Sequence, residues 1–443
     1  MRSWRRELVS LLANLRFAVA LLLLIALFSV VGTVIEQGQT LDFYRENYPL
    51  QPALFGFLTY ERILAWGLNR VYSTWWFLTL LILFGASLVT CTIYRQIPLL
   101  KVAKRWFFVQ KPQTILKLPY AISLPATGWA EVVVGLQKRG YRVWQTDTQF
   151  YASKGLVGRL GPIVVHASML LILLGAIVGA LGGFMAQAMI PSGETAAITN
   201  ITQAGLLSKK WLPQDWRVRV NRFWIAYSEK GKIDQFYSDL SILDREGKEL
   251  DRDTIYVNHP LRFGGVTFYQ ASWDISKIRF QFNRSPILEL SLSPLQAESS
   301  GQKVWGTWLP TKPDLSEGIS LIVPDLQGTV LIFDPQGNLL HTTRVGEAVE
   351  VNGIRLKLVE VVGATGLQIK ADPGVPIVYA GFALLMVGVV MSYISYSQVW
   401  GLCQGDVLYV GGKTNRAQVA FHQELNSIFY REVSTVKPQE YGR

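Results

Sequence analysis

The chain has 443 residues, of which 50% are hydrophobic and only 17% are charged, and its mean hydropathy is +0.23. Soluble globular domains carry about 25% charged residues, so this composition excludes an ordinary soluble protein and favours a membrane protein. The formal net charge is +11. Its distribution along the chain, described below, follows membrane topology and does not indicate a nucleic-acid-binding face.

Four long runs contain no Asp, Glu, Lys or Arg, and they are residues 17–35, 74–94, 160–183 and 374–397. A bilayer core of about 30 Å requires about 20 helical residues to cross it, and each run meets that length. The first run is long for a signal-peptide core and lacks a small-x-small cleavage site, so we interpret it as an uncleaved anchor. We therefore predict a membrane α-helical protein with four transmembrane helices.

Charge predicts the orientation of these helices. The segments 1–16, 95–159 and 398–443 together carry 20 basic and seven acidic residues, a net charge of +13. The segments 36–73 and 184–373 carry 23 basic and 25 acidic residues, a net charge of −2. Because positive loops stay on the cytoplasmic side, we predict cytoplasmic N- and C-termini. The other two segments then lie in the lumen or periplasm.

The two connections that flank the second helix differ in character. The first, 36–73, contains an amphipathic stretch at 54–68 that we expect to lie along the membrane surface. The second, 95–159, predicts a small cytoplasmic β-α-β-β unit. Its elements are the strand TILKLP, the helix GWAEVVVGLQKRG and the hairpin strands YRVWQ and QFYASK.

The large segment 184–373 is predicted to be a mostly β domain, either a sandwich or barrel-like. Turn sequences such as DREGKE, DPQGN, VNGI and GATG separate its apolar or alternating segments at short spacing. The expected strands are WRVRVNRFWIAY, KIDQFYSDLSIL, GVTFYQASW, KIRFQFN, ILELSLS, TVLIFD and IRLKLVEVV. The final segment, 398–443, is interpreted as a cytoplasmic tail.

His166 is the most unusual of the four histidines, because it lies six residues inside the third apolar run. That position is about 9 Å deep at 1.5 Å per residue. Ionisable side chains at such a depth are costly and usually face a protein interior or a cavity. His166 is therefore a candidate haem or metal ligand, or a proton relay. The competing interpretation is a neutral imidazole that hydrogen-bonds to a neighbouring helix.

The other residues that could act as ligands or nucleophiles give weaker signals. His259 lies in the segment VNHPLRFGG, whose turn residues predict a loop position and not a metal ligand. His341 follows the DPQGN turn in a predicted strand, and His422 lies in the tail. Cys91 and Cys403 fall on the predicted cytoplasmic side, where thiols stay reduced. The chain has no C-x-x-C, H-E-x-x-H or G-x-S-x-G motif and no phosphate loop, so we do not expect an enzyme that works alone.

Several long segments, taken in order, carry a family resemblance. The first helix reads LRFAVALLLLIALFSVVGTVIEQ, the second STWWFLTLLILFGASLVTCTIYRQIP, and the third GPIVVHASMLLILLGA, followed by MIPSGE. The large domain contains RFWIAYSEKGKIDQFYSDLSILDREGKE and TIYVNHPLRFGGVTFYQASW. Over nearly its whole length the chain resembles the ResB/CcsB family of c-type cytochrome biogenesis (system II), in its cyanobacterial and plastid branch. Glu36 stands where many ResB relatives carry proline, which fits that branch.

The resemblance implies a function that composition and spacing do not. Members of the family work with a tryptophan-rich, multi-spanning partner of the CcsA/ResC type. Together they move haem b across the membrane and attach it to the C-x-x-C-H cysteines of apocytochromes c on the outer side. The transmembrane histidine of the family, which is associated with haem binding, falls on His166 here. The branch implies a thylakoid (or bacterial inner) membrane and substrates such as cytochrome f and a soluble c-type carrier.

Three interpretations follow from the sequence. The leading one is a haem-ligating, non-catalytic subunit of a cytochrome c haem-lyase complex, with His166 as an axial ligand of the haem iron. One histidine fills one axial position, so the second ligand would come from the partner. The alternative is a structural assembly factor that docks apocytochrome or the partner without contacting haem. A transporter is disfavoured, because the chain lacks inverted repeats and interrupted helices with clustered polar groups.

Overall fold

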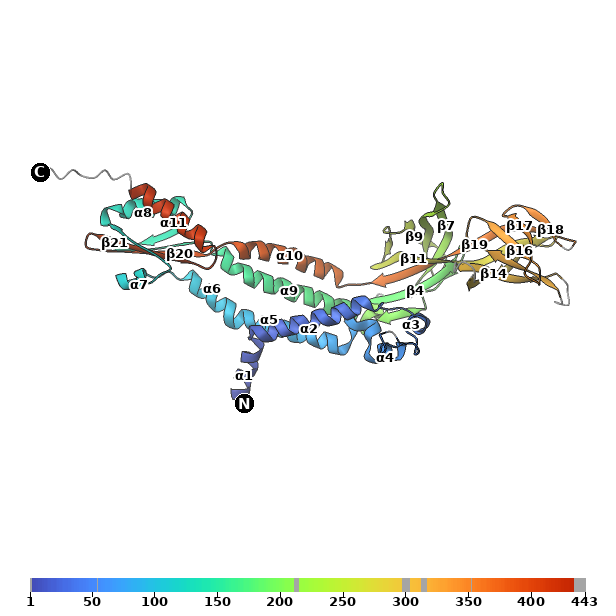
Figure 1. Cartoon of the computed structure of the whole chain (residues 1–443), viewed down its shortest axis with the longest axis horizontal. Coiled ribbons are helices and arrows are strands. Elements are labelled where there is room, and N and C mark those ends of the chain that lie inside the picture. The colour runs from blue at the N-terminus through green and yellow to red at the C-terminus, as the bar shows by residue number, and fades with distance from the viewer. Residues whose placement is uncertain are drawn as a thin grey trace. The chain divides into compact units, whose positions relative to one another are not determined.

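The computed structural model describes all residues except 1, 54, 211–214, 297–302, 312–316, 352 and 434–443. The chain divides into two compact units. The helical unit comprises Met1–Val34, Val71–Ile177 and Gly374–Arg443. The β unit comprises Ile35–Arg70 and Val178–Pro373. Figure 1 labels the elements of both units, which are described separately below.

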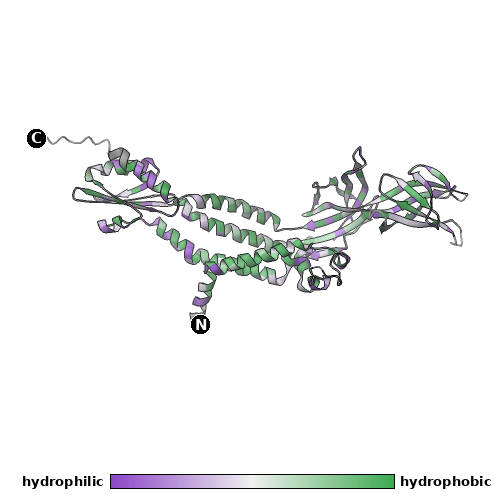
Figure 2. Cartoon of the chain, in the orientation of Figure 1, coloured by the Kyte–Doolittle hydropathy of each residue, from purple (hydrophilic) through white to green (hydrophobic). Residues whose placement is uncertain are grey.

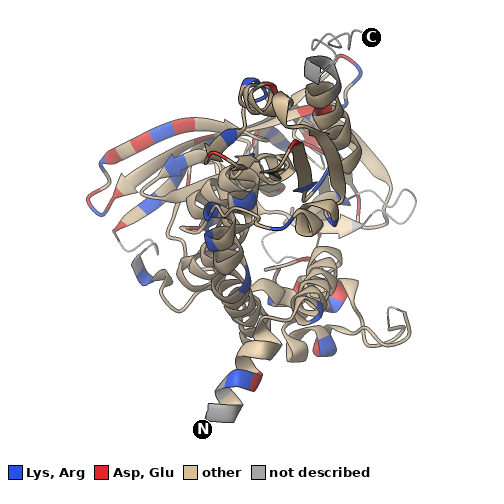
Figure 3. Ribbon diagram, turned by 90° about the vertical axis from the view of Figure 1, so that its left-hand side faces the viewer, with Lys and Arg blue, Asp and Glu red and all other residues tan. Residues whose placement is uncertain are grey.

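Four helices of the described chain are long and apolar enough to cross a membrane, as the sequence predicts. In Figure 2 these helices are hydrophobic along most of their length. A shorter helix, α1 (Arg2–Leu12), precedes them and carries residues of both charge signs (Figure 3). The spanning helices are α2 (Leu15–Val34), α5 (Trp75–Cys91), α9 (Val157–Gly182) and α10 (Val375–Tyr393).

Glycine allows α9 and α10 to approach each other closely. A Cβ atom added at Gly381 would lie 2.6 Å from Cγ1 and 3.0 Å from the backbone nitrogen of Ile172. One added at Gly388 would lie 2.9 Å from the backbone nitrogen of Val165. Backbone contact of this kind is typical of membrane helix pairs, where small residues replace the hydrophobic effect as the source of packing. Leu21, Phe84 and Leu88 form a separate buried contact between α2 and α5.

Helix α5 continues through a π-helical turn, η2 (Thr92–Gln96), into α6 (Ile97–Lys104). Within η2 the backbone N–H of Ile97 bonds to the carbonyl of Thr92, five residues earlier. Pro98 explains this widened turn. Proline has no N–H for the carbonyl of Tyr94, and its ring would clash with that carbonyl in a regular α-helix. Membrane helices accommodate proline through such local π adjustments.

The connection 95–159 and the C-terminal segment fold together into one five-stranded antiparallel sheet, in the order β1-β21-β20-β3-β2. Helices α8 (Trp129–Lys138) and α11 (Gln418–Val433) cover one face of it. The strands are β1 (Tyr120–Pro125), β2 (Arg142–Gln145), β3 (Gln149–Lys154), β20 (Ser397–Gln404) and β21 (Val407–Thr414), and the short helices before β1 and α8 are α7 (Pro112–Leu116) and η3 (Ala126–Gly128).

This domain corrects two predictions. The β-α-β-β order occurs as β1, α8, β2 and β3, but it is not a unit of its own, because β21 and β20 lie between β1 and β3. The tail therefore supplies two central strands and a helix, whose residues Leu425 and Phe429 are fully buried. The expected strand TILKLP is also wrong, since Pro112 starts the short helix α7 and the strand begins only at Tyr120.

The first loop contributes short helices to the β unit. These are α3 (Leu41–Asn47) and α4 (Tyr60–Trp66), followed by the 3₁₀ helix η1 (Leu68–Ser73). The predicted amphipathic helix at 54–68 is thus limited to α4 and ends at Gly67, which has a left-handed φ of 68°. Residue 54 lies outside the described residues. Burial of the Tyr48 hydroxyl beside the Glu36 carboxylate raises the pKa of Tyr48 to about 12.

The rest of the β unit consists of two sandwiches that share one sheet, which confirms the expected β architecture. The shared sheet has the order β10-β11-β19-β4-β6, with β12 and β18 at its edges. One half of it packs on the four-stranded sheet β5-β7-β8-β9 around buried residues such as Val218, Leu240 and Phe268. The other half packs on the five-stranded sheet β13-β14-β15-β16-β17 around Ile278, Leu358 and other apolar residues.

The bounds of these strands agree well with the predicted segments at 216–227, 232–243 and 329–334. A short 3₁₀ helix, η4 (Ser208–Lys210), precedes β7. The strands are β4 (Phe184–Pro191), β5 (Thr195–Ala196), β6 (Ile201–Ala204), β7 (Trp216–Tyr227), β8 (Ile233–Asp244), β9 (Glu249–Tyr256), β10 (Leu261–Phe263), β11 (Val266–Phe282), β12 (Leu288–Ser291), β13 (Ser293–Gln296), β14 (Lys303–Pro310), β15 (Gly318–Val323), β16 (Thr329–Phe333), β17 (Leu339–Arg344), β18 (Ala348–Val351) and β19 (Ile354–Ala371).

Two strands are longer than the sequence indicates. The expected strands GVTFYQASW and KIRFQFN are the two halves of β11, which contains three register irregularities along its pairing with β19. The expected turn GATG, at 363–366, is wrong because it lies inside β19. A Cβ atom at Gly363 would lie 2.8 Å from side-chain atoms of Leu326 and Phe223, so glycine there provides room for packing and does not mark a turn.

Candidate functional site

His166 projects from α9 toward the π turn that follows α5. Its Nδ1 lies 2.9 Å from Oγ1 of Thr92, and its Nε2 lies 3.1 Å from the amide nitrogen of Gln96. The His166 side chain is only partly buried. Both ring nitrogens therefore have a polar partner from the segment that follows α5, in a residue that is not fully buried.

The two partners of His166 are held differently. The hydroxyl of Thr92 also donates a hydrogen bond to the carbonyl of Leu88, 2.8 Å away on α5. The side-chain oxygen of Gln96, in contrast, is buried and has no hydrogen-bond partner among the described residues. Thr92 is thus anchored at two points, whereas Gln96 is anchored only through its amide nitrogen. An unpaired buried carbonyl oxygen costs free energy, so the Gln96 side chain is held less stably than that of Thr92.

The sequence predicted His166 but missed Thr92 and Gln96. Thr92 lies near the end of the second apolar run, 74–94, and Gln96 lies just beyond it. They are four residues apart, which places them on one helix face. That spacing could have marked the two residues as a polar pair on one side of the helix. It does not reveal that this side is turned toward α9, because the choice of neighbouring helix is a property of the tertiary structure.

The other three histidines lie in other elements of the chain. His259 follows a two-residue turn in which Asn258 has a φ of 69°, and it forms an isolated bridge with Tyr256, so the predicted loop position is confirmed. Its ring stacks on Tyr256, and its Nε2 lies 3.4 Å from a carboxylate oxygen of Asp253. His341 lies in β17, as predicted, and His422 lies in α11.

Clusters of metal ligands are absent from the part of the chain that the structure describes. No group of three or more His, Cys, Asp or Glu side chains there is placed to hold a metal ion. Cys91 and Cys403 are both free thiols. His166 belongs to no such group.

The motif MIPSGE has a structural explanation in the β unit. The hydroxyl of Ser192 accepts a hydrogen bond from the backbone N–H of Phe223, 3.0 Å away on β7. Gly193 has a φ of 86° and donates its N–H to the carbonyl of Val220, at 2.7 Å. The segment after β4 is thus fastened to the opposite sheet of the first sandwich, so the motif positions two layers of the β unit.

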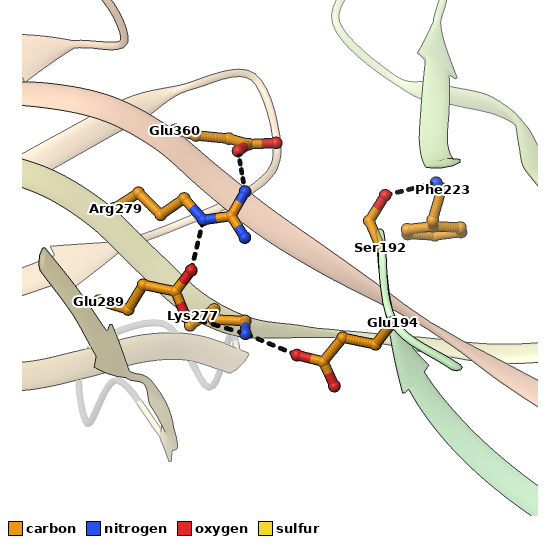
Figure 4. A network of polar contacts seen from close by, with 7 residues as sticks. All are labelled: Ser192, Glu194, Phe223, Lys277, Arg279, Glu289 and Glu360. Atoms are coloured by element: carbon orange, nitrogen blue, oxygen red, sulfur yellow. Dashed lines mark hydrogen bonds and ion pairs between the residues drawn. The ribbon is translucent and has the colours of Figure 1, made fainter. Parts of the chain in front are cut away.

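A network of ion pairs continues from this motif across the shared sheet (Figure 4). Lys277 lies 2.6 Å from Glu194 and 3.1 Å from Glu289, and these carboxylates raise the pKa of Lys277. Arg279 lies 2.7 Å from both Glu289 and Glu360. Hydrogen bonds from Arg279 and Lys277 lower the pKa of Glu289. Because each of these five charges has an opposite partner, the network is a connection between strands and not an open binding site.

Comparison with known proteins identifies relatives along most of the chain. The model of the ResB-like family matches residues 15–304 and 323–426. A protein of Thermosynechococcus vestitus named cytochrome c biogenesis protein CcsB is 60% identical over 423 residues, which cover 96% of this chain and 95% of the relative. Proteins of the same name from Microcystis aeruginosa and Trichormus variabilis are 57% and 58% identical, and the matches cover 95% and 96% of this chain and 94% and 93% of those relatives.

Proposed function

The chain belongs to the ResB-like family, and we propose that it works in the biogenesis of c-type cytochromes as a subunit of a membrane complex that delivers and attaches haem. In this proposal haem is the cargo of the complex. It crosses the membrane and is joined to apocytochrome c on the lumenal or periplasmic side. The chain is not an enzyme by itself, and the attachment reaction belongs to the complex.

His166 is the observation that carries the proposal. An imidazole nitrogen is a common axial ligand of haem iron, and apolar helix walls suit the faces of a porphyrin. His166 lies on an apolar helix and is only partly buried, and its Nε2 is bonded only to the singly anchored amide of Gln96. Iron binding at Nε2 requires the loss of that one hydrogen bond. The residues around His166 therefore fit a single iron ligand.

A second subunit follows from the single ligand. His166 is in no group of three or more potential metal ligands among the described residues, and six-coordinate haem requires a second axial ligand on its other face. We propose a tryptophan-rich membrane partner of the CcsA/ResC type that supplies it. Both proteins would lie in the same lipid bilayer. The proposed function involves no nucleic acid.

The β unit is then the part that meets the protein substrate. We propose that it lies in the thylakoid lumen, or in the periplasm of a bacterial inner membrane, while both termini are cytoplasmic. The charge balance of +13 against −2 supports this orientation. Apocytochromes c, such as those of cytochrome f and a soluble carrier, would dock there while haem is presented to their thiols.

The alternative function is a structural assembly factor that holds the partner or apocytochrome and does not touch haem. One observation favours it: both nitrogens of His166 have a hydrogen-bond partner within the chain. A neutral histidine that joins two helices by hydrogen bonds needs no ligand. The haem-binding function and this one differ in what His166 contributes to the complex.

One substitution distinguishes the two functions. In the complex purified with its partner, His166→Ala should lower the haem content and the yield of mature cytochrome c, and added imidazole should partly restore both. His341→Ala, at an exposed position of β17, is the control and should leave both at the wild-type level. Full haem content and full maturation in His166→Ala would favour the assembly factor. The chain expressed without its partner should mature no cytochrome.

A further inference from the structure

The hydrogen bonds around Thr92 determine which nitrogen of His166 carries the proton. A threonine hydroxyl has a single proton, and the carbonyl of Leu88, 2.8 Å from Oγ1, can only accept one. A Thr92 hydroxyl that donates to Leu88 has no second proton for His166. In that arrangement Oγ1 of Thr92 accepts at 2.9 Å from Nδ1 of His166, which then carries the ring proton.

The contact with Gln96 agrees with this assignment. A neutral imidazole protonated at Nδ1 has a lone pair on Nε2, and the amide nitrogen of Gln96 donates to it at 3.1 Å. With the ring proton on Nδ1, the opposite orientation of the amide would place its oxygen against an unprotonated Nε2, a contact that only a second ring proton and a charged imidazolium could satisfy. Charge in a membrane span is costly, so the neutral arrangement is the stable one.

We propose that Thr92 and Gln96 are positioning residues for His166: Thr92 fixes the ring with its Nε2 lone pair available for haem iron, and Gln96 occupies Nε2 until haem displaces it. This inference rests on the proposed haem binding by His166. Histidine ligands of metals characteristically donate their second N–H to a fixed acceptor, which sets the tautomer and the direction of the ring. The chain from His166 through Thr92 to Leu88 is such an anchor.

Gln96 is suited to be released because little holds it. Its side-chain oxygen has no partner, so leaving Nε2 breaks only one hydrogen bond. One net hydrogen bond corresponds to about a five-fold change in an equilibrium constant. The amide therefore keeps the ring paired in the absence of haem at a small cost to haem affinity. Thr92 should therefore increase the affinity of His166 for haem, whereas Gln96 should slightly decrease it. Substitutions of the two residues should change haem binding in different directions.

The tautomer is tested first, without haem. The full chain, with histidines labelled with nitrogen-15 and reconstituted in lipid nanodiscs, should give a His166 signal from a protonated Nδ1 and an unprotonated Nε2. The variant His166→Gln identifies that signal among the four histidines. Thr92→Val, which removes the hydroxyl at similar volume, should shift the proton toward Nε2, and Thr92→Ser should restore it. Thr90→Val is the matched control, because the hydroxyl of Thr90 also bonds to a carbonyl four residues back, that of Ala86.

Haem binding is tested second, by titration of haem b into the haem-free complex and measurement of the Soret band. Loss of an anchor of a metal-ligating histidine lowers metal affinity by about 10-fold or more, so Thr92→Val should bind haem that much more weakly. Gln96→Met, which removes the amide at similar size, should bind haem as tightly as wild type or up to about five-fold more tightly. Thr92→Ser and Thr90→Val should match wild type.

The outcomes separate this inference from the proposed function. A wild-type signal with the proton on Nε2 overturns the role of Thr92, as does a Thr92→Val variant with unchanged tautomer and unchanged haem affinity. A Gln96→Met complex that no longer binds haem shows that Gln96 is not a displaceable partner. If His166→Gln leaves the Soret band unchanged while the tautomer results hold, the proposed haem ligation fails and the hydrogen-bond anchor remains as a helix contact.

Discussion

The hydroxyl of Thr92 lies 2.9 Å from Nδ1 of His166, a residue 74 positions away in the chain and on a different helix. The contact depends on the π turn that Pro98 imposes at the end of α5 and on the direction of α9. It connects a polar residue near the end of one apolar run with the partly buried histidine of the next. This hydrogen bond and the one from Gln96 give both nitrogens of a histidine in a membrane helix a polar partner.

The predicted membrane orientation can be tested with single cysteines. In a variant without Cys91 and Cys403, Glu246→Cys in the turn after β8 should react with a membrane-impermeant thiol reagent added to bacterial spheroplasts. Gln137→Cys, exposed on α8, should react only after lysis. The reason is the excess of basic residues on the segments predicted to be cytoplasmic. The reverse labelling pattern would contradict the orientation.

The close contact between α9 and α10 predicts different effects of two glycine substitutions. A methyl group at Gly381 would lie 2.6 Å from Cγ1 of Ile172, so Gly381→Ala should destabilise the helical unit by about 1–3 kcal/mol, as overpacking does. At Gly85 the nearest atoms, in Leu170 and Leu173, are 3.7 Å away. Gly85→Ala should therefore be neutral or stabilise α5 by up to about 1 kcal/mol. Thermal unfolding in detergent measures both, and equal loss of stability in the two variants would be evidence against the contact.

The participation of the C-terminal helix in the small sheet domain predicts a large effect at Leu425. This side chain is fully buried against α8 and the sheet, so Leu425→Ala should cost about 2–5 kcal/mol. Gln423→Ala, at an exposed position of the same helix, should change stability by less than about 0.5 kcal/mol. Hydrogen exchange of the amides in β20 and β21 reports the local stability. Similar protection in the two variants would mean that α11 does not complete this core.

The stability of the β unit should depend on pH through Asp239. Arg252 donates to the two oxygens of this carboxylate at 2.9 and 2.6 Å, and these bonds hold the pKa of Asp239 below its ordinary value of 3.8. A lowered pKa in the folded state means that the pair stabilises the fold fully above pH 3.8. That stabilisation is lost as the pH falls through the lower pKa of the folded state.

The corresponding substitution separates this pair from general acid denaturation. Asp239→Asn should lower the stability of the β unit at pH 7 only slightly, because solvent screens an ion pair whose arginine is half exposed. The variant should also lose less stability than wild type between pH 5 and pH 2, over a range of about three pH units around the ordinary pKa. Asp234→Asn, exposed on the same strand, is the control. Parallel pH profiles of wild type and Asp239→Asn, measured by hydrogen exchange of β8, would exclude this role.

The sequence alone was sufficient to identify those helices, strands and residues whose local pattern follows directly from a physical requirement. Apolar run length identifies α2, α5, α9 and α10, because each helix must satisfy its own backbone hydrogen bonds across the bilayer. Alternating side chains identify β7 and β8, because one face of each strand is buried. The depth of His166 marks it for the same reason, since an ionisable group in an apolar run is costly.

Tertiary structure alone decided which of these elements meet. The strands β20 and β21 lie between β1 and β3, although β3 ends at Lys154 and β20 begins only at Ser397, a pairing that no local pattern encodes. The glycines of GATG read as a turn, but close packing against Leu326 and Phe223 explains them. Thr92 and Gln96 became part of the candidate site only because the π turn faces α9. Local sequence determines where a segment can be stable, whereas the partner of each segment depends on contacts that only the folded chain makes.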